Sequence, residues 1–444
     1  MATYIFEITD YHAIKKASVK LDGITVLSGI NGSGKSTIAR WLQHTVYTLV
    51  HYDRLVEQEG IDELTSTIYR LINFINSLVG TQQSLPIRNL YDTIKYHQPN
   101  TFNEVESVYK DICGMIVDLL TDYLSQVNDP KDFYRIVNYL RIPFENNETI
   151  STESFSALFA KSLAEDLENI RRRIQEKKAN RTDFNFSEKI FSITDNDIEE
   201  NEINLQFWED GVKLLGDKDF KIPLMLSRVI YINTQEIGNA FKTSDIRNRL
   251  YRMLSESSGA LTDESTALIR MIRGTIGGEV QVRRSKIIPS QRASFRFVSR
   301  NGKAFNIKGA ATGIISFSYI LQLLQNGWLD ENTLLIIDEP ESHLHPQWIV
   351  EYARILVLIQ KYLGTKILVS SHNPDMVSAI QSISSKNGLK KMTRFYLAEP
   401  DYNSGDQYNF TDLGFNIEKI FDSFNIAIDR IADYGDPTYE EDDM

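Results

Sequence analysis

The segment from Gly29 to Ser36, which reads Gly-Ile-Asn-Gly-Ser-Gly-Lys-Ser, constrains the fold of this chain more than any other segment. It fits the pattern G-x-x-x-x-G-K-[ST], in which glycines allow backbone N–H groups to turn toward phosphate oxygens. The apolar run at 23–28 predicts a buried strand before the loop, and the apolar spacing at 36–50 predicts a helix after it. This order places the positive end of a helix at the bound anion. The segment therefore predicts a phosphate-binding loop.

The loop also predicts a ligand and its metal. In such a loop the lysine, here Lys35, reaches the β- and γ-phosphates, and the hydroxyl of Ser36 binds Mg²⁺. We expect ATP and Mg²⁺ as the bound species. The residues expected to contact the nucleotide from the loop are Asn31, Gly32, Ser33, Gly34, Lys35, Ser36 and Thr37.

Two carboxylates follow an apolar run at 334–337 and form a second motif. A magnesium–phosphate site needs a carboxylate at the end of a strand beside the phosphate loop, and Asp338 meets this need as a metal ligand. Glu339 comes next and is the candidate base that orients and deprotonates the attacking water. A solvated strand end with two acids is the alternative, and the phosphate loop in the same chain argues against it.

A histidine forms the third candidate for catalysis. His372 follows the apolar run at 366–371, so it stands at the end of a further predicted strand. A hydrogen bond from this histidine to the γ-phosphate would report whether ATP is present. A single histidine at a strand end is often structural, but its place one strand after Asp338 and Glu339 favours the functional interpretation.

Together these segments resemble the head of ABC-type ATPases, and within that group they look closest to the OLD-like (overcoming lysogenization defect) ATPases of prokaryotic antiphage systems. The resemblance covers about residues 1–50 and 225–400. It implies an α/β P-loop NTPase fold of the ABC-ATPase type with a large α-helical insertion. The segments that carry it are Gly29–Thr37, Asp338–Pro340, Glu341–Pro346 and Ser371–Pro374.

The resemblance implies roles for further residues. Lys35 matches the Walker A lysine, Asp338 the Walker B aspartate, Glu339 the catalytic base and His372 the switch histidine. Segment 342–345 matches the D-loop, which touches the partner subunit. The signature that precedes Walker B is matched by 310–313, with Thr312 in place of the usual serine and Gly313 as its glycine; a second glycine and a glutamine are missing. Gln235 has the chain order of a Q-loop residue.

Four segments are expected from these assignments. Residues 1–52 form the N-terminal part of the ATPase head with Walker A, and 53–225 form a mainly helical insertion. Residues 226–432 form the C-terminal part of the head, with the signature, Walker B, D-loop and switch histidine, and 433–444 form an acidic tail. In ABC-type heads the signature contacts the γ-phosphate held by another subunit, so the resemblance implies a homodimer or higher homo-oligomer.

Charge and composition limit the kinds of partner that this chain is expected to bind. A net charge of −12 argues against general coating of nucleic acid, which requires many Lys and Arg side chains. Two basic stretches, 171–181 and 283–296, are compatible with local contact with nucleic acid. The alternative for 171–181 is a solvated helix end, and the alternative for 283–296 is the outer face of a hairpin. No run reaches the ~18 apolar residues of a membrane helix, so we expect a cytoplasmic protein without a membrane partner. The single cysteine, Cys113, is expected to be a small buried side chain.

The expected function is that of a regulatory ATPase. The resemblance implies an ATP-binding and ATP-hydrolysing protein that dimerises around ATP and controls a separate effector, such as a nuclease, in antiphage defence. Full OLD-type nucleases carry a TOPRIM domain, and here the only acids near a predicted strand end after His372, Glu399 and Asp401, stand alone. The effector is therefore expected from a neighbouring gene. The alternative is a DNA-repair or DNA-binding ATPase of the RecF or SMC type.

Overall fold

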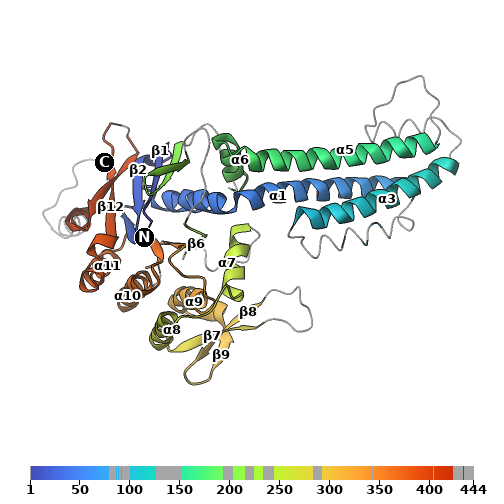
Figure 1. Cartoon of the computed structure of the whole chain (residues 1–444). Coiled ribbons are helices and arrows are strands. Elements are labelled where there is room, and N and C mark those ends of the chain that lie inside the picture. The colour runs from blue at the N-terminus through green and yellow to red at the C-terminus, as the bar shows by residue number, and fades with distance from the viewer. Residues whose placement is uncertain are drawn as a thin grey trace. The chain divides into compact units, whose positions relative to one another are not determined.

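The computed structural model divides the chain into two compact units, Met1–Val50 with Thr182–Met444 and His51–Arg181 (Figure 1). Helix α1 (Lys35–Val79) contributes to both, and it is interrupted at His51, where φ is −117° and ψ is 17°. The described residues are 2–79, 87, 89, 92, 101–126, 152–193, 204–215, 225–233, 245–283, 293–342, 344–403, 405–423 and 434.

Ten strands of the described residues form one sheet in the first unit, in the order β5-β4-β1-β2-β13-β12-β3-β11-β10-β6. At one end of this order, β12, β3, β11, β10 and β6 pair in parallel with one another. At the other end, β5, β4, β1 and β2 pair antiparallel. The strands are β1 (Tyr4–Tyr11), β2 (Ile14–Leu21), β3 (Ile24–Ser28), β4 (Asn204–Glu209), β5 (Val212–Leu215), β6 (Arg228–Asn233), β10 (Thr333–Asp338), β11 (Lys366–Ser371), β12 (Thr393–Pro400) and β13 (Tyr408–Gly414).

The central strands are buried on both faces. Every residue of β3, β10 and β11 is buried, which explains why these segments read as continuous apolar runs rather than as alternating ones. The predicted alternation of strands and helices in the final third, with parallel strands, is confirmed. The parallel arrangement brings the carboxyl ends of β3, β10 and β11 to the same edge of the sheet.

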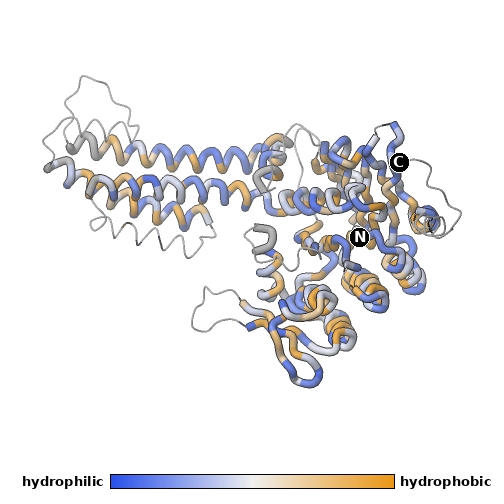
Figure 2. The backbone as a smooth tube through the Cα atoms, turned by 180° about the vertical axis from the view of Figure 1, so that it is seen from behind, coloured by the Kyte–Doolittle hydropathy of each residue, from blue (hydrophilic) through white to orange (hydrophobic). Residues whose placement is uncertain are grey.

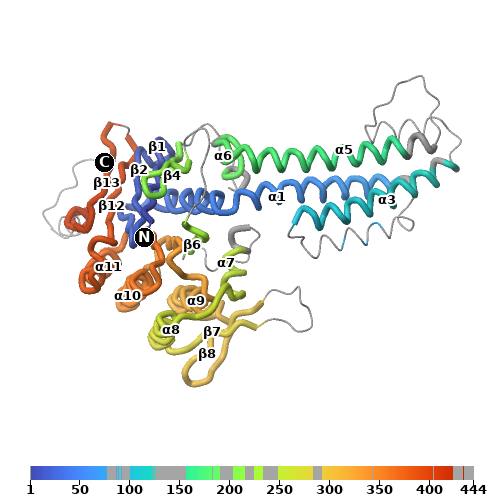
Figure 3. The backbone as a smooth tube through the Cα atoms, viewed as in Figure 1, coloured from blue at the N-terminus to red at the C-terminus, as the bar shows by residue number. Residues whose placement is uncertain are grey.

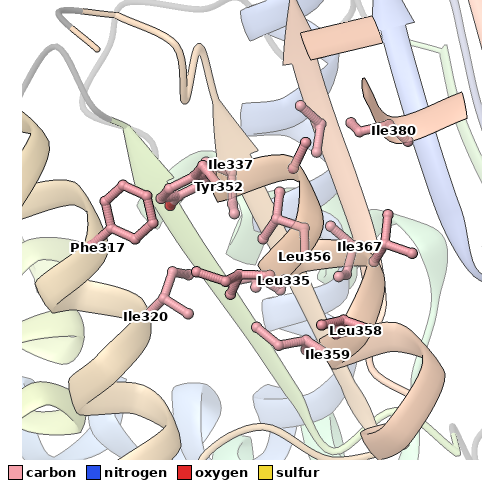
Figure 4. Packing of buried hydrophobic residues seen from close by; sticks show 14 of the residues in the cluster. Phe317, Ile320, Leu335, Ile337, Tyr352, Leu356, Leu358, Ile359, Ile367 and Ile380 are labelled. Carbon is pink, nitrogen blue, oxygen red and sulfur yellow. The ribbon is translucent and has the colours of Figure 1, made fainter. Parts of the chain in front are cut away.

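The main core of the first unit lies between this sheet and four helices, α8 (Asp263–Ile276), α9 (Thr312–Gln325), α10 (Pro346–Leu363) and α11 (Pro374–Lys386). Figure 4 shows side chains of α9, α10 and α11 beside those of β10 and β11. The labelled residues are Phe317, Ile320, Leu335, Ile337, Tyr352, Leu356, Leu358, Ile359, Ile367 and Ile380. This packing fixes the strand ends that carry the acidic and histidine motifs.

The first unit also contains two further helices and a small sheet. They are α6 (Asp183–Ile193), α7 (Asp245–Ser255) and the antiparallel strands β7 (Gly278–Arg283), β8 (Ser294–Ser299) and β9 (Ala304–Asn306). The hairpin predicted at 294–307 is confirmed, and Gly302 in its Asn-Gly turn has a φ of 77°. A short 3-10 turn, Ile307–Gly309, connects this sheet to α9.

The pair β4–β5 lies in the first unit. The hairpin predicted at 203–215 is confirmed, but β4 also pairs with β1, with Tyr4 opposite Glu209. Figure 3 shows β4 beside β1. The second compact unit therefore ends at Arg181, before the end of the segment 53–225 that was expected to form the insertion. Strand β13 was not predicted. Most of the acidic tail lies outside the described residues.

The second unit is helical. The part of α1 after His51 packs with α3 (Phe102–Gln126) and α5 (Thr152–Ala179) around a core that includes Leu64, Ile112 and Leu167. Figure 2 shows hydrophobic and hydrophilic positions alternating along these helices, as expected when one face is packed and the other meets water. The hydroxyl of Thr101 accepts a hydrogen bond from the backbone N–H of Glu104 at 3.4 Å and caps α3.

The basic end of α5 is paired with acids of the same unit. Arg173 lies 2.6 Å from Glu63 on α1, and Arg171 pairs with Glu106 on α3. Further pairs are Lys177 with Glu59 at 3.1 Å, Lys178 with Glu57 at 3.2 Å and Arg181 with Asp53 at 2.8 Å. The residue numbers of the acidic partners decrease along α1 as those of the basic residues increase. This order is expected for two antiparallel helices with matching charges.

Cys113, which was predicted to be a small buried side chain, is packed but not fully buried. It is half-buried at the edge of the helical core, and burial raises the pKa of its thiol to about 12. In the part of the chain that the structure describes, no helix combines the length and apolar character needed to cross a membrane.

Candidate active site

The glycine-rich loop leaves the end of β3 and enters α1. Gly29 and Gly34 have φ values of 152° and 95°, in the region that favours glycine. The loop is also closely packed at these two positions, because a Cβ on Gly34 would lie 2.7 Å from Ile14 Cγ1 and one on Gly29 would lie 2.7 Å from Ala398 Cβ. The two glycines are thus required by the backbone path and by close packing against residues of β2 and β12.

Lys35 is held inside this loop. Its Nζ donates hydrogen bonds to the carbonyl oxygens of Gly29 at 2.8 Å and Ile30 at 2.7 Å, and the residue is only 4% exposed. Burial lowers the pKa of Lys35, against the opposing effect of the carboxylates of Glu339, Asp338 and Glu341. The ammonium group therefore lies between the loop and the acidic strand end.

Ser36 and Asp338 meet although they are far apart in the sequence. The Ser36 hydroxyl donates to Asp338 Oδ1 at 3.0 Å, which joins the first turn of α1 to the end of β10. Asp338 is 3% exposed, and it also accepts from the hydroxyl of Ser370, which is opposite it on β11. Tyr231 on β6 donates to Asp338 Oδ2 at 3.0 Å. Burial, and then the Asp338 charge, raise the pKa of Tyr231, so its phenol stays a neutral donor.

Glu339 occupies a turn with an unusual backbone. Its φ of 50° is left-handed, a conformation that costs a non-glycine residue on the order of 1–3 kcal/mol. The turn is held because the Glu339 N–H donates to the carbonyl of Ser370 at 3.0 Å and the Ser342 N–H donates to the carbonyl of Glu339 at 3.1 Å. The chain thus bends away from β10 immediately after Asp338, which separates the two carboxylates.

His372 lies beside two carboxylates at the end of β11. Its Nδ1 is 3.4 Å from Glu339 Oε1 and 3.6 Å from Glu341 Oε1. The side chain is 41% exposed, so one side of the ring faces acids and the ring remains accessible. The structure therefore brings together Lys35, Ser36, Asp338, Glu339 and His372, with Glu341 as an additional member.

The proposed signature residues begin α9. Thr312 is the first residue of this helix, and the preceding Ala311 provides no side-chain cap. Gly313 is buried, and a Cβ on it would lie 2.6 Å from the ring of Trp348 and 3.0 Å from Leu344 Cδ2. Among the hydrogen bonds of the described residues, none joins Thr312 or Gly313 to the phosphate loop. Gln235 and His343 lie outside the described residues.

Three residues of this site escaped prediction from sequence. Ser370 and Tyr231 reach Asp338 only because parallel pairing aligns β11 and β6 with β10. Glu341 was part of the acidic segment, but no role followed from its position. One signal in the sequence could have found Ser370. It stands near the end of the apolar run at 366–371, and that strand was predicted to end near the phosphate loop.

These features define the class of fold. A mixed sheet with parallel central strands, a glycine-rich loop between β3 and α1, and a buried aspartate at the end of β10 form an α/β P-loop ATPase fold of the ABC type with a helical insertion. Residues 159–378 match the family model described as "AAA domain, putative AbiEii toxin, Type IV TA system". The match covers just under half of the chain and begins after the phosphate loop.

Several solved structures are similar to the chain at low TM-scores. An Smc head domain with an extended coiled coil, bound to the C-terminal domain of ScpA, from Pyrococcus furiosus, is 10% identical with a TM-score of 0.34, covering 97% of this chain and 100% of that one. The SMC head domain from Thermotoga maritima is 9% identical, with a TM-score of 0.35 and coverage of 93% and 99%. An Smc head domain with a coiled coil and joint from Pyrococcus yayanosii is 11% identical, with a TM-score of 0.38 and coverage of 96% and 100%. Among curated proteins, no sequence matches the chain.

Proposed function

We propose that this protein binds Mg²⁺-ATP and hydrolyses it to ADP and phosphate. The observation that carries the proposal is the 3.0 Å hydrogen bond between Ser36 and Asp338, because it brings the phosphate loop and the acidic strand end to one place. A phosphate loop alone would support nucleotide binding. Its combination with a carboxylate that can bind metal and a second carboxylate beside a histidine supports hydrolysis.

The loop holds the phosphates. Backbone N–H groups of the loop and of the first turn of α1 surround the β- and γ-phosphates. Lys35 exchanges the two loop carbonyls that it binds in the free protein for phosphate oxygens. Its burial supports this role, since a desolvated ammonium gains most from an incoming anion. The nucleotide-contacting residues are Asn31, Gly32, Ser33, Gly34, Lys35, Ser36 and Thr37.

The donors at Ser36 and Asp338 fit magnesium. Both are hard oxygen donors, and Mg²⁺ is commonly bound in proteins through one or two carboxylates together with substrate phosphates. The Tyr231 and Ser370 hydroxyls orient the Asp338 carboxylate from both sides. When bound, the metal neutralises charge on the phosphates.

Glu339 acts as the base. Water attacks the γ-phosphorus, the bond from that phosphorus to the oxygen shared with the β-phosphate breaks, and the Glu339 carboxylate takes the water proton. The left-handed turn supports this role because it directs Glu339 away from the strand while Asp338 remains buried in the sheet. His372, beside Glu339, contacts the γ-phosphate and senses its presence.

A second copy of the chain completes the site. Thr312 and Gly313 begin an uncapped helix and make no hydrogen bond to the loop of their own chain, which supports a contact with ATP held by a partner subunit. Gln235 is a further contact to the nucleotide by its chain order. We expect a homodimer with two ATP molecules at the interface.

The ATPase regulates an effector protein, such as a nuclease, in antiphage defence. The matched family description names a putative toxin of a toxin–antitoxin system, a setting in which one protein controls another. The ion pairs of the basic end of α5 favour this function over DNA binding, because the Arg and Lys side chains there already have acidic partners.

The test is ATP binding and hydrolysis by the purified chain and its Lys35→Ala variant. We expect the wild type to bind Mg²⁺-ATP, to dimerise in light scattering when ATP is present, and to release phosphate. The variant is expected to lose nucleotide affinity. Equal affinity and equal hydrolysis by the two proteins would refute the proposed function, and an unchanged monomer with bound ATP would refute the shared site.

A further inference from the structure

Glu341 is a buried carboxylate for which neither the acidic motif nor the proposed chemistry provides a role. It lies in the turn after β10, two residues beyond Glu339, and is only 5% exposed. Burial raises the pKa of Glu341 above its ordinary value. Its Oε2 has no hydrogen-bond partner in the part of the chain that the structure describes. An acid in such a place carries a free-energy cost, which calls for an explanation.

The other oxygen of Glu341 binds the turn that carries His372. Glu341 Oε1 accepts from the Ser371 hydroxyl at 2.7 Å and from the backbone N–H of His372 at 3.0 Å. The Ser371 hydroxyl in turn accepts from the N–H of Asn373 at 3.1 Å. One carboxylate oxygen thus holds three consecutive residues at the end of β11, and the path of this turn depends on it.

The same oxygen faces the histidine ring. His372 Nδ1 lies 3.6 Å from Glu341 Oε1 and 3.4 Å from Glu339 Oε1. Nδ1 forms no hydrogen bond with the described residues, so these are contacts of a ring nitrogen with two carboxylates rather than hydrogen bonds. Both neighbours lie on the Nδ1 side of the ring, which leaves the other ring nitrogen for a partner elsewhere. In hydrolases with a Ser-His-Asp triad, a buried carboxylate beside the histidine holds the ring in the orientation needed for catalysis.

We propose that Glu341 is a positioning residue for ATP hydrolysis, which holds the backbone and the ring of His372 in place beside Glu339. This inference rests on the proposed function, because His372 is taken to contact the γ-phosphate. The hydrogen bonds of Glu341 reach the turn after β11 and not the phosphate loop. Its removal is therefore expected to slow hydrolysis while ATP affinity, which depends on Lys35 and Ser36, stays close to that of the wild type.

The experiment measures kcat, KM and the affinity for Mg²⁺-ATP of the full chain with Glu341→Ala and Glu341→Gln. Loss of a partner that orients a metal-bound histidine typically reduces activity by about 10–100-fold, and we take the lower end of that range for His372. We expect Glu341→Ala to lower kcat at least about tenfold, with nucleotide affinity changed by less than about threefold. Glu341→Gln keeps an acceptor oxygen for Ser371 and the His372 N–H but replaces the second carboxylate oxygen with an NH₂ group, so its kcat is expected between those of the wild type and the alanine variant.

A double-mutant cycle with His372→Ala separates positioning from general stabilisation. If Glu341 acts through the histidine, both Glu341 variants lose their effect on kcat in the His372→Ala background. Glu351→Gln, an exposed glutamate on α10 that pairs with Arg354, is the matched control and is expected to keep wild-type kinetics.

Three outcomes would overturn the role of Glu341. They are a folded Glu341→Gln variant with the kcat of the wild type, a loss of kcat that persists in the His372→Ala background, and a loss of ATP affinity as large as the loss of kcat. The glutamine variant decides the question even if the alanine variant fails to fold, which thermal melting would reveal. If instead Lys35→Ala has full activity, the proposed function fails, and that result is distinct from a failure of the role of Glu341.

Discussion

Gly313 provides a test that separates packing from ligand contact, since both explain a glycine at the start of α9. The space for a side chain is already filled. A Cβ would lie 2.6 and 2.8 Å from two ring atoms of Trp348 and 3.0 Å from Leu344 Cδ2. The Trp348 ring is packed edge-on against Phe317 at a centroid distance of 5.5 Å, so it has little room to move away. The change to test is Gly313→Ala.

The magnitude follows from two opposing effects. Adding a methyl group to a filled core costs about 1–3 kcal/mol. Replacing glycine by alanine in a helix returns up to about 1 kcal/mol, and less near the helix end. We therefore expect Gly313→Ala to lower the free energy of unfolding by about 1–2 kcal/mol in the absence of nucleotide. Gly309→Ala is the control, because nothing lies within 4 Å of a Cβ at that position.

The assay is urea unfolding of the nucleotide-free protein followed by far-ultraviolet circular dichroism, with the shift in midpoint compared at equal slopes. A variant with the stability of the wild type would show that Trp348 and Leu344 do not constrain this position. In that case the contact with ATP across the dimer would remain as the reason for the glycine. A loss of stability in Gly309→Ala equal to that in Gly313→Ala would also contradict the packing argument.

Three other predictions concern charge and burial. Arg173→Glu is expected to destabilise the helical unit by about 0.2–1 kcal/mol in urea unfolding, and adding Glu63→Arg should recover most of this; no recovery would refute the register. Because the pKa of Glu341 is raised in the folded protein, the stability it contributes is present below its ordinary value near 4.5 and is lost as pH rises through the raised value. The melting temperature of the wild type should therefore rise relative to Glu341→Gln as pH falls from 7 toward 4.5, and a constant difference would contradict this. With a pKa of about 12, Cys113 should react slowly with a thiol reagent at pH 7 until urea unfolds the chain; rapid labelling of the folded protein would contradict its burial.

Local patterns predicted the elements that build the site. The runs before Gly29 and Asp338 are buried on both faces, which gives them an unbroken apolar signature, and the glycine-rich loop carries its own motif. The antiparallel hairpins at 203–215 and 294–307 were also predictable, since each is closed by a short turn whose residues favour positive φ.

Features that depend on distant pairing were not predictable. Nothing local to 204–209 indicates that this strand pairs with β1, because Tyr4 and Glu209 become neighbours only in the folded sheet. The same holds for Ser370 and Tyr231, which reach Asp338 through the register of three parallel strands. The basic end of α5 was ambiguous for a similar reason, since its acidic partners lie on other helices.

The central claim is that the Glu339 carboxylate deprotonates water at ATP held by the phosphate loop. The most direct measurement is phosphate release in a single turnover by the wild type and Glu339→Gln, with ATP retention measured in the same samples. The account predicts that Glu339→Gln retains ATP with near wild-type affinity, releases phosphate at least about a hundredfold more slowly, as expected for loss of a general base, and accumulates as the ATP-bound dimer. Phosphate release by Glu339→Gln at the wild-type rate would contradict it.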